Sequence, residues 1–160
     1  MELGGRGAVG MLKRADKFDV DRIVAFEAEV MNRKLYGKPL DRDAARSEIN
    51  SNEYYLHLRD GRLIATGAFR RREDASAYLS NIAVHPEMRR QGLARAMMRH
   101  LFSFCNDAPS IDLAVHPDNQ PALALYASVG FTPTSCREDF FGDGEPRLIM
   151  VCPSRAALGL

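Results

Sequence analysis

The sequence predicts a mixed α/β (α+β) fold: a mostly antiparallel sheet of about seven strands, with a central parallel pair and helices on both faces. Three observations carry this prediction. Strand-like and helical runs follow one another in the order β-α-α-β-β-β-α-β-α-β-β. Asp60-Gly61 stands between two strand-like runs, which is a strong hairpin signal. Residues 77–115 read as strand, helix and strand, which gives a parallel pair joined by a right-handed crossover.

The N-terminal half predicts one strand, two helices and a hairpin. Residues 8–14 form the candidate strand, and apolar residues then recur at helical spacing over 20–31 in a segment that ends before Gly37. Asp41 is the expected N-cap of a second helix, since its side chain can accept a backbone hydrogen bond there. The two hairpin strands and the exposed turn after them are expected at 54–58, 63–69 and 70–74.

The C-terminal half predicts four strands and two helices. A wide apolar stripe runs over 93–105, which is typical of a helix that packs on a sheet. Asn119-Gln120-Pro121 opens another helix, because proline is tolerated in a first helical turn, and Gly130 ends it. The strands of this half are expected at 77–84, 111–115, 131–136 and 147–151.

Length and charge restrict the class of protein. At 160 residues, of which 46% are hydrophobic, the chain is expected to form one domain over 1–160. Its 22 Lys and Arg residues nearly balance 21 Asp and Glu residues, so a net charge of +1 offers no general attraction to nucleic acid or membranes. No apolar run approaches the roughly 20 residues of a membrane helix, and residues 1–7 lack a signal-peptide core. We therefore expect a cytoplasmic monomer or homodimer with no nucleic-acid or membrane partner.

The cysteines and acidic residues indicate neither a disulfide framework nor a metal site. Cys105, Cys136 and Cys152 are an odd number, and no Cys-x-x-Cys spacing is present. The segment 142–145 reads as a hairpin turn, because a calcium loop needs more oxygen ligands at alternating positions. We expect buried or idle thiols and no metal.

The junction between the strand 77–84 and the next helix has the makings of a phosphate-binding turn. Gly92 lets the backbone approach a ligand, and the small Ala94 keeps the first helical turn uncluttered. The first N–H groups of a helix have no intrahelical acceptor, and the helix dipole favours an anion there. Arg89 and Arg90 add full charges. The alternative is that these arginines are only the solvated start of a helix.

Two further polar residues are expected at the carboxyl ends of the parallel strands, where open α/β sheets bind their ligands. Asn119 opens a helix, and Tyr126 follows two turns later on the same face. Both side chains can therefore reach one crevice. The alternatives are that Asn119 only caps its helix and that Tyr126 belongs to the core.

Taken together, these motifs resemble the GNAT superfamily of acetyl-CoA-dependent N-acetyltransferases. The resemblance is carried by Asn81-Ile82-Ala83-Val84-His85-Pro86, Arg89-x-x-Gly92-x-Ala94, Asn119-x-x-Ala122-x-x-Leu125-Tyr126 and Gly130-Phe131. It covers residues 77–131, and the remaining elements fit the chain order of the family. It implies an enzyme that moves an acetyl group from acetyl-CoA, its co-substrate, directly to a primary amine.

The resemblance also implies roles for individual residues. The backbone amides expected to grip the CoA diphosphate belong to Arg89, Arg90, Gln91, Gly92, Leu93 and Ala94. The main chain expected to pair with pantetheine belongs to Ile82, Ala83 and Val84. Asn119 is expected to contact the pantetheine arm, and Tyr126 to protonate the departing thiolate. A splayed strand pair would supply free N–H groups to the thioester carbonyl.

The acceptor amine is harder to assign. Residues 137–150 resemble the terminal hairpin of protein N-terminal acetyltransferases, including those that act on ribosomal proteins. Asp139-Phe140-Phe141 stand where those enzymes usually have Asn-Tyr-Tyr, so two hydroxyls are missing. A peptide or protein amine is favoured. The alternatives are a metabolite or antibiotic amine, a longer acyl donor, and a catalytically silent acyl-CoA-binding module.

The general base is also displaced from its usual position. Ala114 occupies a place where protein N-terminal acetyltransferases often carry Glu or His. His116 lies two residues further along, on the same face if the strand continues to it, and it is the candidate for relaying the amine proton. Tyr78 and Asp139 are weaker candidates.

Overall fold

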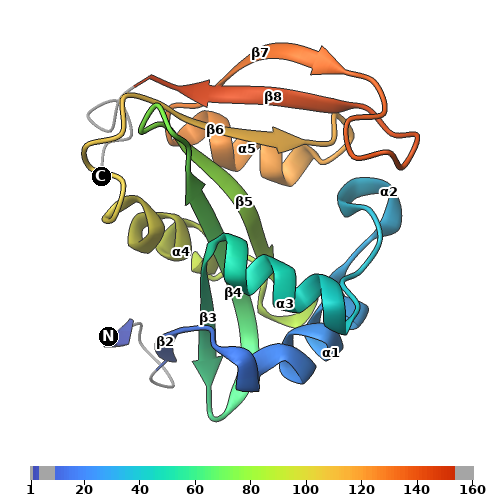
Figure 1. The fold of residues 1–160 in the computed structure, drawn as a ribbon, viewed down its shortest axis with the longest axis vertical. Coiled ribbons are helices and arrows are strands. Elements are labelled where there is room, and N and C mark those ends of the chain that lie inside the picture. The colour runs from blue at the N-terminus through green and yellow to red at the C-terminus, as the bar shows by residue number, and fades with distance from the viewer. Residues whose placement is uncertain (1, 4–9, 154–160) are drawn as a thin grey trace.

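The computed structural model describes residues 2–3 and 10–153, which form a single twisted sheet flanked by helices (Figure 1). The order of the eight strands in the sheet is β1-β2-β3-β4-β5-β6-β8-β7. All neighbours are antiparallel except β5 and β6. The strands are β1 Glu2–Leu3, β2 Gly10–Arg14, β3 Glu53–Arg59, β4 Arg62–Arg71, β5 Ala77–Val84, β6 Ile111–Val115, β7 Thr132–Arg137 and β8 Arg147–Cys152. The predicted fold class is confirmed; positions 8 and 9 of the first expected strand lie outside the described residues.

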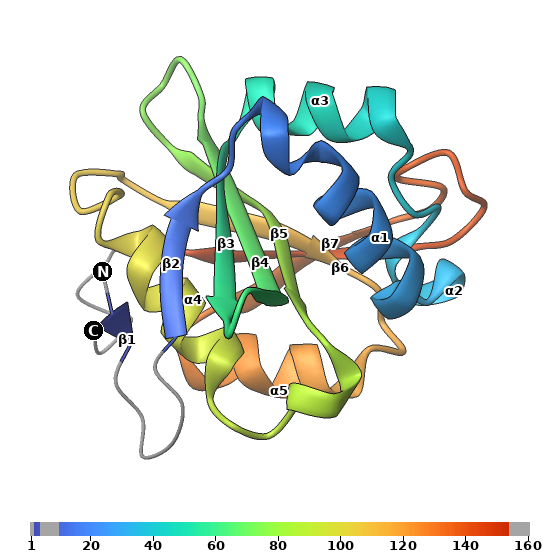
Figure 2. The same ribbon diagram turned by 90° about the horizontal axis from the view of Figure 1, so that it is seen from below.

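Helices cover both faces of the sheet (Figure 2). They are α1 Val20–Val30, α2 Arg33–Tyr36, α3 Arg42–Ser51, α4 Leu93–Phe102 and α5 Gln120–Ser128. Side chains of α1 and α3 form one apolar core with β3 and β4, and side chains of α4 and α5 form a second core on the other face. In the described part of the chain, no helix is long and apolar enough to cross a membrane.

Two predicted segments differ from the structure in their boundaries. The first helix was expected as one segment ending before Gly37, but the helix stops at Val30 and α2 begins separately. The Asn32 side chain accepts hydrogen bonds from the backbone of Lys34 and Leu35, which restarts the helix after a break. The exposed turn predicted at 70–74 is shorter, because Arg70 and Arg71 pair with β5 as the end of β4.

The helix predicted to carry an apolar stripe over 93–105 is also shorter than its pattern. It ends at Phe102, and the following turns are held by backbone bonds such as Cys105 N–H to Phe102 C=O. Cys105 is nonetheless buried in the same core. The apolar pattern therefore predicted burial correctly one turn beyond the end of the helix.

The two parallel strands separate soon after they meet. β5 and β6 pair only at Ala77 with Ile111 and at Tyr78 with Asp112. Directly beyond this point, the pairing of β5 with β4 shifts by one residue at Ser80. Such a bulge bends a strand and increases its twist, which turns β5 away from β6. The facing edges of the two strands are left unpaired with each other, as the splay expected from the family resemblance requires.

The helix α4 approaches the sheet closely at Gly67. A Cβ atom at this position would lie 2.4 Å from Cγ of Met97. We expect Gly67→Ala to destabilise the fold by about 2 kcal/mol, because overpacking forces the helix or Met97 to move. Urea denaturation measures the change. In a Met97→Ala background the same substitution should cost clearly less, and an equal cost in both backgrounds would contradict the contact.

Candidate active site

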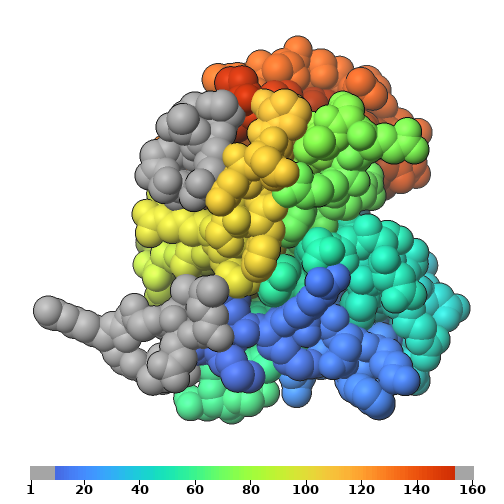
Figure 3. All heavy atoms as spheres, turned by 60° about the vertical axis from the view of Figure 1, so that its left-hand side comes forward, coloured from blue at the N-terminus to red at the C-terminus, as the bar shows by residue number. Residues whose placement is uncertain are grey.

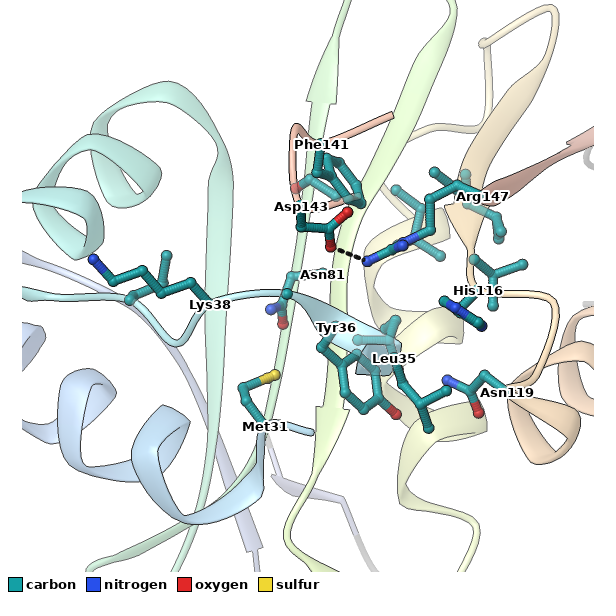
Figure 4. Close-up of a pocket in the computed structure, with 18 of the residues that line it drawn as sticks. Met31, Leu35, Tyr36, Lys38, Asn81, His116, Asn119, Phe141, Asp143 and Arg147 are labelled. Atoms are coloured by element: carbon teal, nitrogen blue, oxygen red, sulfur yellow. Dashed lines mark hydrogen bonds and ion pairs between the residues drawn. The ribbon is translucent and has the colours of Figure 1, made fainter. Parts of the chain in front are cut away.

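A cavity of about 590 Å³ lies where β5 and β6 diverge, a volume typical of a small-molecule site (Figure 4). Both strands contribute to its wall. Their lining residues are Tyr78, Leu79, Ser80, Asn81, Ile82, Leu113, Ala114 and Val115. Since the facing edges of the strands do not pair beyond Tyr78, backbone N–H and C=O groups are available at this wall.

The predicted phosphate turn has the backbone of an anion cradle. Arg90 and Gly92 both have positive φ angles, of 64° and 76°, and they turn the chain into α4 at Leu93. Gly92 is the N-cap and offers no side chain to the first N–H groups of the helix. A Cβ atom on Gly92 would meet nothing within 4 Å, so the space above the cradle is open. The first amides of α4 are thus free to bind an anion.

The side chains around this cradle are also oriented so that charged and polar groups face solvent and the apolar one faces the core. Arg89, Arg90 and Gln91 are exposed, whereas Leu93 points into the core. The turn follows directly from β5 but does not line the cavity. Of the predicted pantetheine residues, Ile82 lines the cavity, whereas the Ala83 side chain packs in the opposite core. A role for Ala83 would therefore use its main chain, as the family resemblance implies.

Asn119 and Tyr126 both line the cavity from α5, as their spacing predicted. Asn119 also caps this helix, because its side-chain oxygen accepts a hydrogen bond from the Ala122 N–H at 3.3 Å. Tyr126 packs edge-on against Phe131, with ring centroids 6.0 Å apart, and belongs to the core. Both residues thus combine their structural role with a place at the cavity.

The ionisation of Tyr126 is governed by its surroundings. Burial raises the pKa of its hydroxyl above the ordinary value, and the nearby Tyr36 and Tyr78 raise it further. The hydroxyl therefore keeps its proton across the physiological range. A neutral phenol packed in the apolar core can donate a proton only to a group that becomes basic during the reaction, which is the behaviour of a thiolate as it leaves.

His116 lines the cavity too, but both of its ring nitrogens are engaged. Nδ1 accepts a hydrogen bond from the Asp118 N–H at 3.0 Å, which assigns the ring proton of the neutral form to Nε2. Nε2 lies 2.7 Å from a Glu145 carboxylate oxygen and donates to it. A proton taken up by this ring would displace the Asp118 contact. The weaker candidates differ: Tyr78 lines the cavity, whereas the Asp139 side chain accepts from the Gly144 N–H in the β7–β8 loop.

Two segments close the cavity: α2, which the sequence did not single out, and the loop of the predicted terminal hairpin. In Figure 4, Leu35 and Tyr36 of α2 lie on one side, and the β7–β8 loop with Asp143 lies on the other. Arg147 is 1% exposed and fixes this loop through a 2.9 Å ion pair with Asp143. An arginine at the start of an otherwise apolar strand is the feature of the sequence that could have predicted this buried ion pair.

Three further polar residues line the cavity from the α1 and α3 side: Glu27, Glu48 and Tyr54. Glu27 is 3% exposed, and burial, aided by the charge of Glu48, raises its pKa to about 7. Its position could have been found in the sequence, because Val20, Ile23, Glu27 and Val30 share one helical face. A carboxylate within an apolar stripe is the signal that sequence reasoning missed.

The cavity continues into a second hollow of about 520 Å³. Glu48, Tyr78, Ser80 and Phe141 line both. The second hollow is bordered by the end of β4, and Figure 3 shows the β4–β5 turn, in green, projecting above α3, in teal. Because the two hollows share these residues, they adjoin each other. Within residues 2–3 and 10–153, no group of three or more His, Cys, Asp or Glu side chains is placed to hold a metal ion.

Comparison with known proteins gives a match to one family. Residues 21–131 match the acetyltransferase (GNAT) family. Over 139 residues the chain is 32% identical to a Bacillus subtilis (strain 168) protein assigned as a ribosomal protein bS18-alanine N-acetyltransferase. That match covers 82% of this chain and 87% of the relative.

Solved structures share the fold. The ribosomal-protein-S18-alanine N-acetyltransferase from Escherichia coli matches with a TM-score of 0.74 and 25% identity, over 90% of this chain and 93% of that chain. A PaiA N-acetyltransferase from Thermoplasma acidophilum, solved in complex with coenzyme A, matches with a TM-score of 0.72 over 90% of this chain and 98% of that chain. At 15% identity, this second likeness concerns the fold alone.

Proposed function

This chain belongs to the GNAT family of acetyltransferases, and from that premise we propose that it acetylates a primary amine of a peptide or protein directly from acetyl-CoA. The observation that carries the proposal is the cavity between the diverging β5 and β6, which Tyr126 also lines. The continuous second hollow favours an extended acceptor over a small molecule. The names of the Bacillus and Escherichia relatives, which specify an alanine of a ribosomal protein, favour an N-terminal amine.

The residues present fit acetyl-CoA along one path. We assign the diphosphate to the amides of Arg89, Arg90, Gln91, Gly92, Leu93 and Ala94. The main chain of Ile82, Ala83 and Val84 would bind the pantetheine arm by extending the sheet at the free edge of β5. Asn119 would contact the same arm. The open space above Gly92 and the unpaired edge of β5 support this path.

The chemistry needs a neutral amine, a polarised thioester carbonyl and a sulfur that can leave. As the C–N bond forms and the C–S bond breaks, Tyr126 gives its proton to sulfur. The proton that nitrogen loses at this stage returns to Tyr126. A phenol with an ordinary pKa of about 10 is a weak acid toward a thiolate whose conjugate acid is near 8.5, so its position matters more than its acidity.

We propose that His116 has a positioning role, because its ring holds Glu145 in the loop before β8. We expect His116→Ala to lower kcat/KM at saturating acetyl-CoA by about tenfold, because the turn at 116–118 loses its hydrogen bonds. His116→Gln keeps a donor toward Glu145 and should retain most of the activity. Steady-state kinetics of both variants separate the roles. If Gln is as damaging as Ala, the imidazole ring itself is required, and if Ala has no effect, His116 has no role in the reaction.

A screen for thiol release tests the proposed function. Peptides with free N-termini, the same peptides with blocked N-termini, and a panel of metabolite and antibiotic amines are incubated with acetyl-CoA. We expect CoA release with free peptides and none with blocked ones. Isothermal titration with acetyl-CoA is measured alongside. Tight binding of acetyl-CoA without CoA release in the presence of any acceptor would instead indicate a catalytically silent binding module. CoA release only from a longer acyl-CoA would show that the donor is not acetyl-CoA.

We further propose that the chain works as a single domain, in the cytoplasm, as a monomer or homodimer. The near-zero net charge supports a mechanism without a nucleic-acid or membrane partner. Direct transfer between acetyl-CoA and an amine requires no metal. Activity that persists after dialysis against a chelator checks this last point.

A further inference from the structure

We propose that Glu27 takes a proton from the ammonium group of the acceptor, so that this end of the cavity binds the acceptor as a cation and converts it into the reactive amine. The inference rests on the proposed function and deepens it, because it names the group that prepares the nucleophile. It concerns a residue of α1 outside the motifs that carry the family resemblance.

The first support is that Glu27 is buried with no cation or hydrogen-bond donor of the described residues paired to its carboxylate. The side chain lines the cavity and is 3% exposed. Among residues 2–3 and 10–153, no hydrogen-bond donor or cation contacts its carboxylate. An ionised carboxylate taken from water without a partner destabilises a fold, so buried charges are normally paired. A ligand that brings its own positive charge and N–H donors would supply the missing partner.

The second support is the hydroxyl of Tyr54, on the same wall. Tyr54 lines the cavity and is 1% exposed, and its hydroxyl interacts with the Thr66 side chain but makes no hydrogen bond of ordinary geometry in the described part of the chain. Tyr54 and Glu27 thus place a poorly satisfied hydroxyl and an unpaired carboxylate at one end of the cavity. A primary ammonium has three N–H donors and can satisfy both at once.

The charges around this end favour a cation. Glu48 on α3 and Tyr54 on β3 interact electrostatically with Glu27, so the carboxylates at this wall repel each other. Glu48 itself accepts a 2.9 Å hydrogen bond from the Asn52 side chain and interacts with Arg70 on β4 and Tyr78 on β5. Lys38 and Arg147 also line the cavity, but Arg147 pairs with Asp143 and neither forms an ion pair with Glu27, so a cationic acceptor can take that place.

Proton transfer within the bound pair costs little in this setting, because the two pKa values lie about one unit apart. Burial first, and the charge of Glu48 second, raise the pKa of Glu27 to about 7. A peptide N-terminal ammonium has an ordinary pKa of about 8. Transfer of one proton turns a carboxylate and an ammonium into a neutral acid and a neutral amine, which a low-dielectric cavity prefers.

The protons balance over the whole reaction. The ammonium loses its first proton to Glu27, which later passes it to water that enters the cavity after the product leaves. The neutral amine then forms the C–N bond, and the C–S bond breaks. The second nitrogen proton replaces the one that Tyr126 gives to sulfur. Acid and base are separate groups of one cavity, with their pKa values set by different surroundings.

Glu27→Gln tests the proposal through the pH dependence of kcat/KM for a peptide acceptor. In the unchanged protein we expect kcat/KM to rise with pH near 7 as Glu27 ionises. The variant should be about 100-fold slower at pH 7 and should follow only the ionisation of the amine itself. The deficit should therefore shrink between about pH 8 and 9.5, where free amine becomes abundant.

Glu48→Gln is the matched variant. It removes a negative neighbour, so it should lower the pKa of Glu27 and move the rise in kcat/KM toward lower pH. The two substitutions are isosteric, yet their predicted effects on the profile differ in kind: one abolishes the rise near pH 7, and the other displaces it. A rise that stays in place in both variants would overturn the role of Glu27.

Stability gives a readout that does not depend on turnover. Since the pKa of Glu27 is about 7 in the fold against an ordinary 4.5, ionisation destabilises the fold as pH rises between these values. The penalty is absent below about pH 4.5 and complete above about pH 7. Glu27→Gln should therefore raise Tm by several degrees at pH 8 and leave it unchanged at pH 4.5. An unchanged Tm at both pH values contradicts the buried, uncompensated carboxylate.

The failures are distinguishable. If the unchanged protein acetylates no peptide, the proposed function fails, while a carboxyl ¹³C NMR titration still tests whether Glu27 titrates near pH 7. If peptides are acetylated and Glu27→Gln keeps the original profile, only the inference about Glu27 fails. If Glu27→Gln does not fold, the displacement of the profile in Glu48→Gln decides the matter.

Discussion

Tyr126→Phe should lower kcat by about 100-fold while changing the Kd for acetyl-CoA by less than about twofold. The hydroxyl is proposed to act only when sulfur leaves, so its removal affects the transition state and spares the ground state. The ring itself remains, and with it the edge-on packing against Phe131 at 6.0 Å between centroids. We therefore expect the fold and the cavity wall to be retained.

The pKa of Tyr126 adds a constraint on the pH profile. Burial holds this pKa above its ordinary value, so the hydroxyl stays protonated wherever the enzyme is active. Loss of the Tyr126 proton should consequently not appear as a fall in kcat up to about pH 9. A fall centred well below that pH would show that the hydroxyl ionises more easily than its surroundings indicate.

The measurement combines pre-steady-state thiol release with isothermal titration of acetyl-CoA. Tyr55→Phe is the matched control, because Tyr55 on β3 stacks on Phe104 at 5.5 Å and does not line the cavity. It should leave kcat and Kd unchanged. If Tyr126→Phe turns over as fast as the unchanged protein, another group protonates sulfur. If it loses acetyl-CoA affinity instead, Tyr126 shapes the binding site.

The second large effect is expected at the start of α4. Ala94→Asp places a carboxylate at the second position of the helix, beside the amides that we assign to the diphosphate. Two like charges about 4 Å apart near a protein surface repel by about 4 kcal/mol. We therefore expect the Kd for acetyl-CoA to rise at least about 100-fold. The same aspartate suits the helix dipole, so Tm should stay the same or rise.

Ala94→Asn separates charge from size, since asparagine has nearly the same shape and no charge. It should weaken acetyl-CoA binding far less than Ala94→Asp. Isothermal titration and thermal denaturation of both variants check the pair of expectations. Equal weakening by both substitutions would indicate a steric effect at this turn. If the Kd for acetyl-CoA is unchanged in Ala94→Asp, the diphosphate binds elsewhere and the turn around Gly92 is not its site.

Elements with strong local signals were predicted nearly to the residue. The strand β5 occupies 77–84 and β6 occupies 111–115, as expected from their apolar runs. Asp41 caps α3 through a hydrogen bond from the Ala44 N–H, as its residue type and position indicated. Asn119 and Tyr126 share a cavity because seven residues span two helical turns. These features depend on neighbours within a few positions along the chain.

Other features depend on residues that are distant in sequence. The helix α2, which closes the cavity, is joined to the segment before α5 by a 2.8 Å ion pair between Lys34 and Asp118, which no local pattern predicts. The engagement of His116 with Glu145 joins the end of β6 to the loop before β8. A candidate base chosen from strand periodicity therefore turned out to have both ring nitrogens occupied.

By itself, the sequence determined the order of elements, the parallel crossover and the turn at Gly92, because caps, glycines and apolar periodicity act over a few residues. Only the tertiary structure decided how far β5 and β6 part, since that depends on the bulge at Ser80 where β5 pairs with β4. It also decided the environment of Glu27, whose burial arises from α1 packing over the sheet. Desolvation is a property of the assembled surroundings, so a carboxylate acquires a shifted pKa only once the fold has removed water from it.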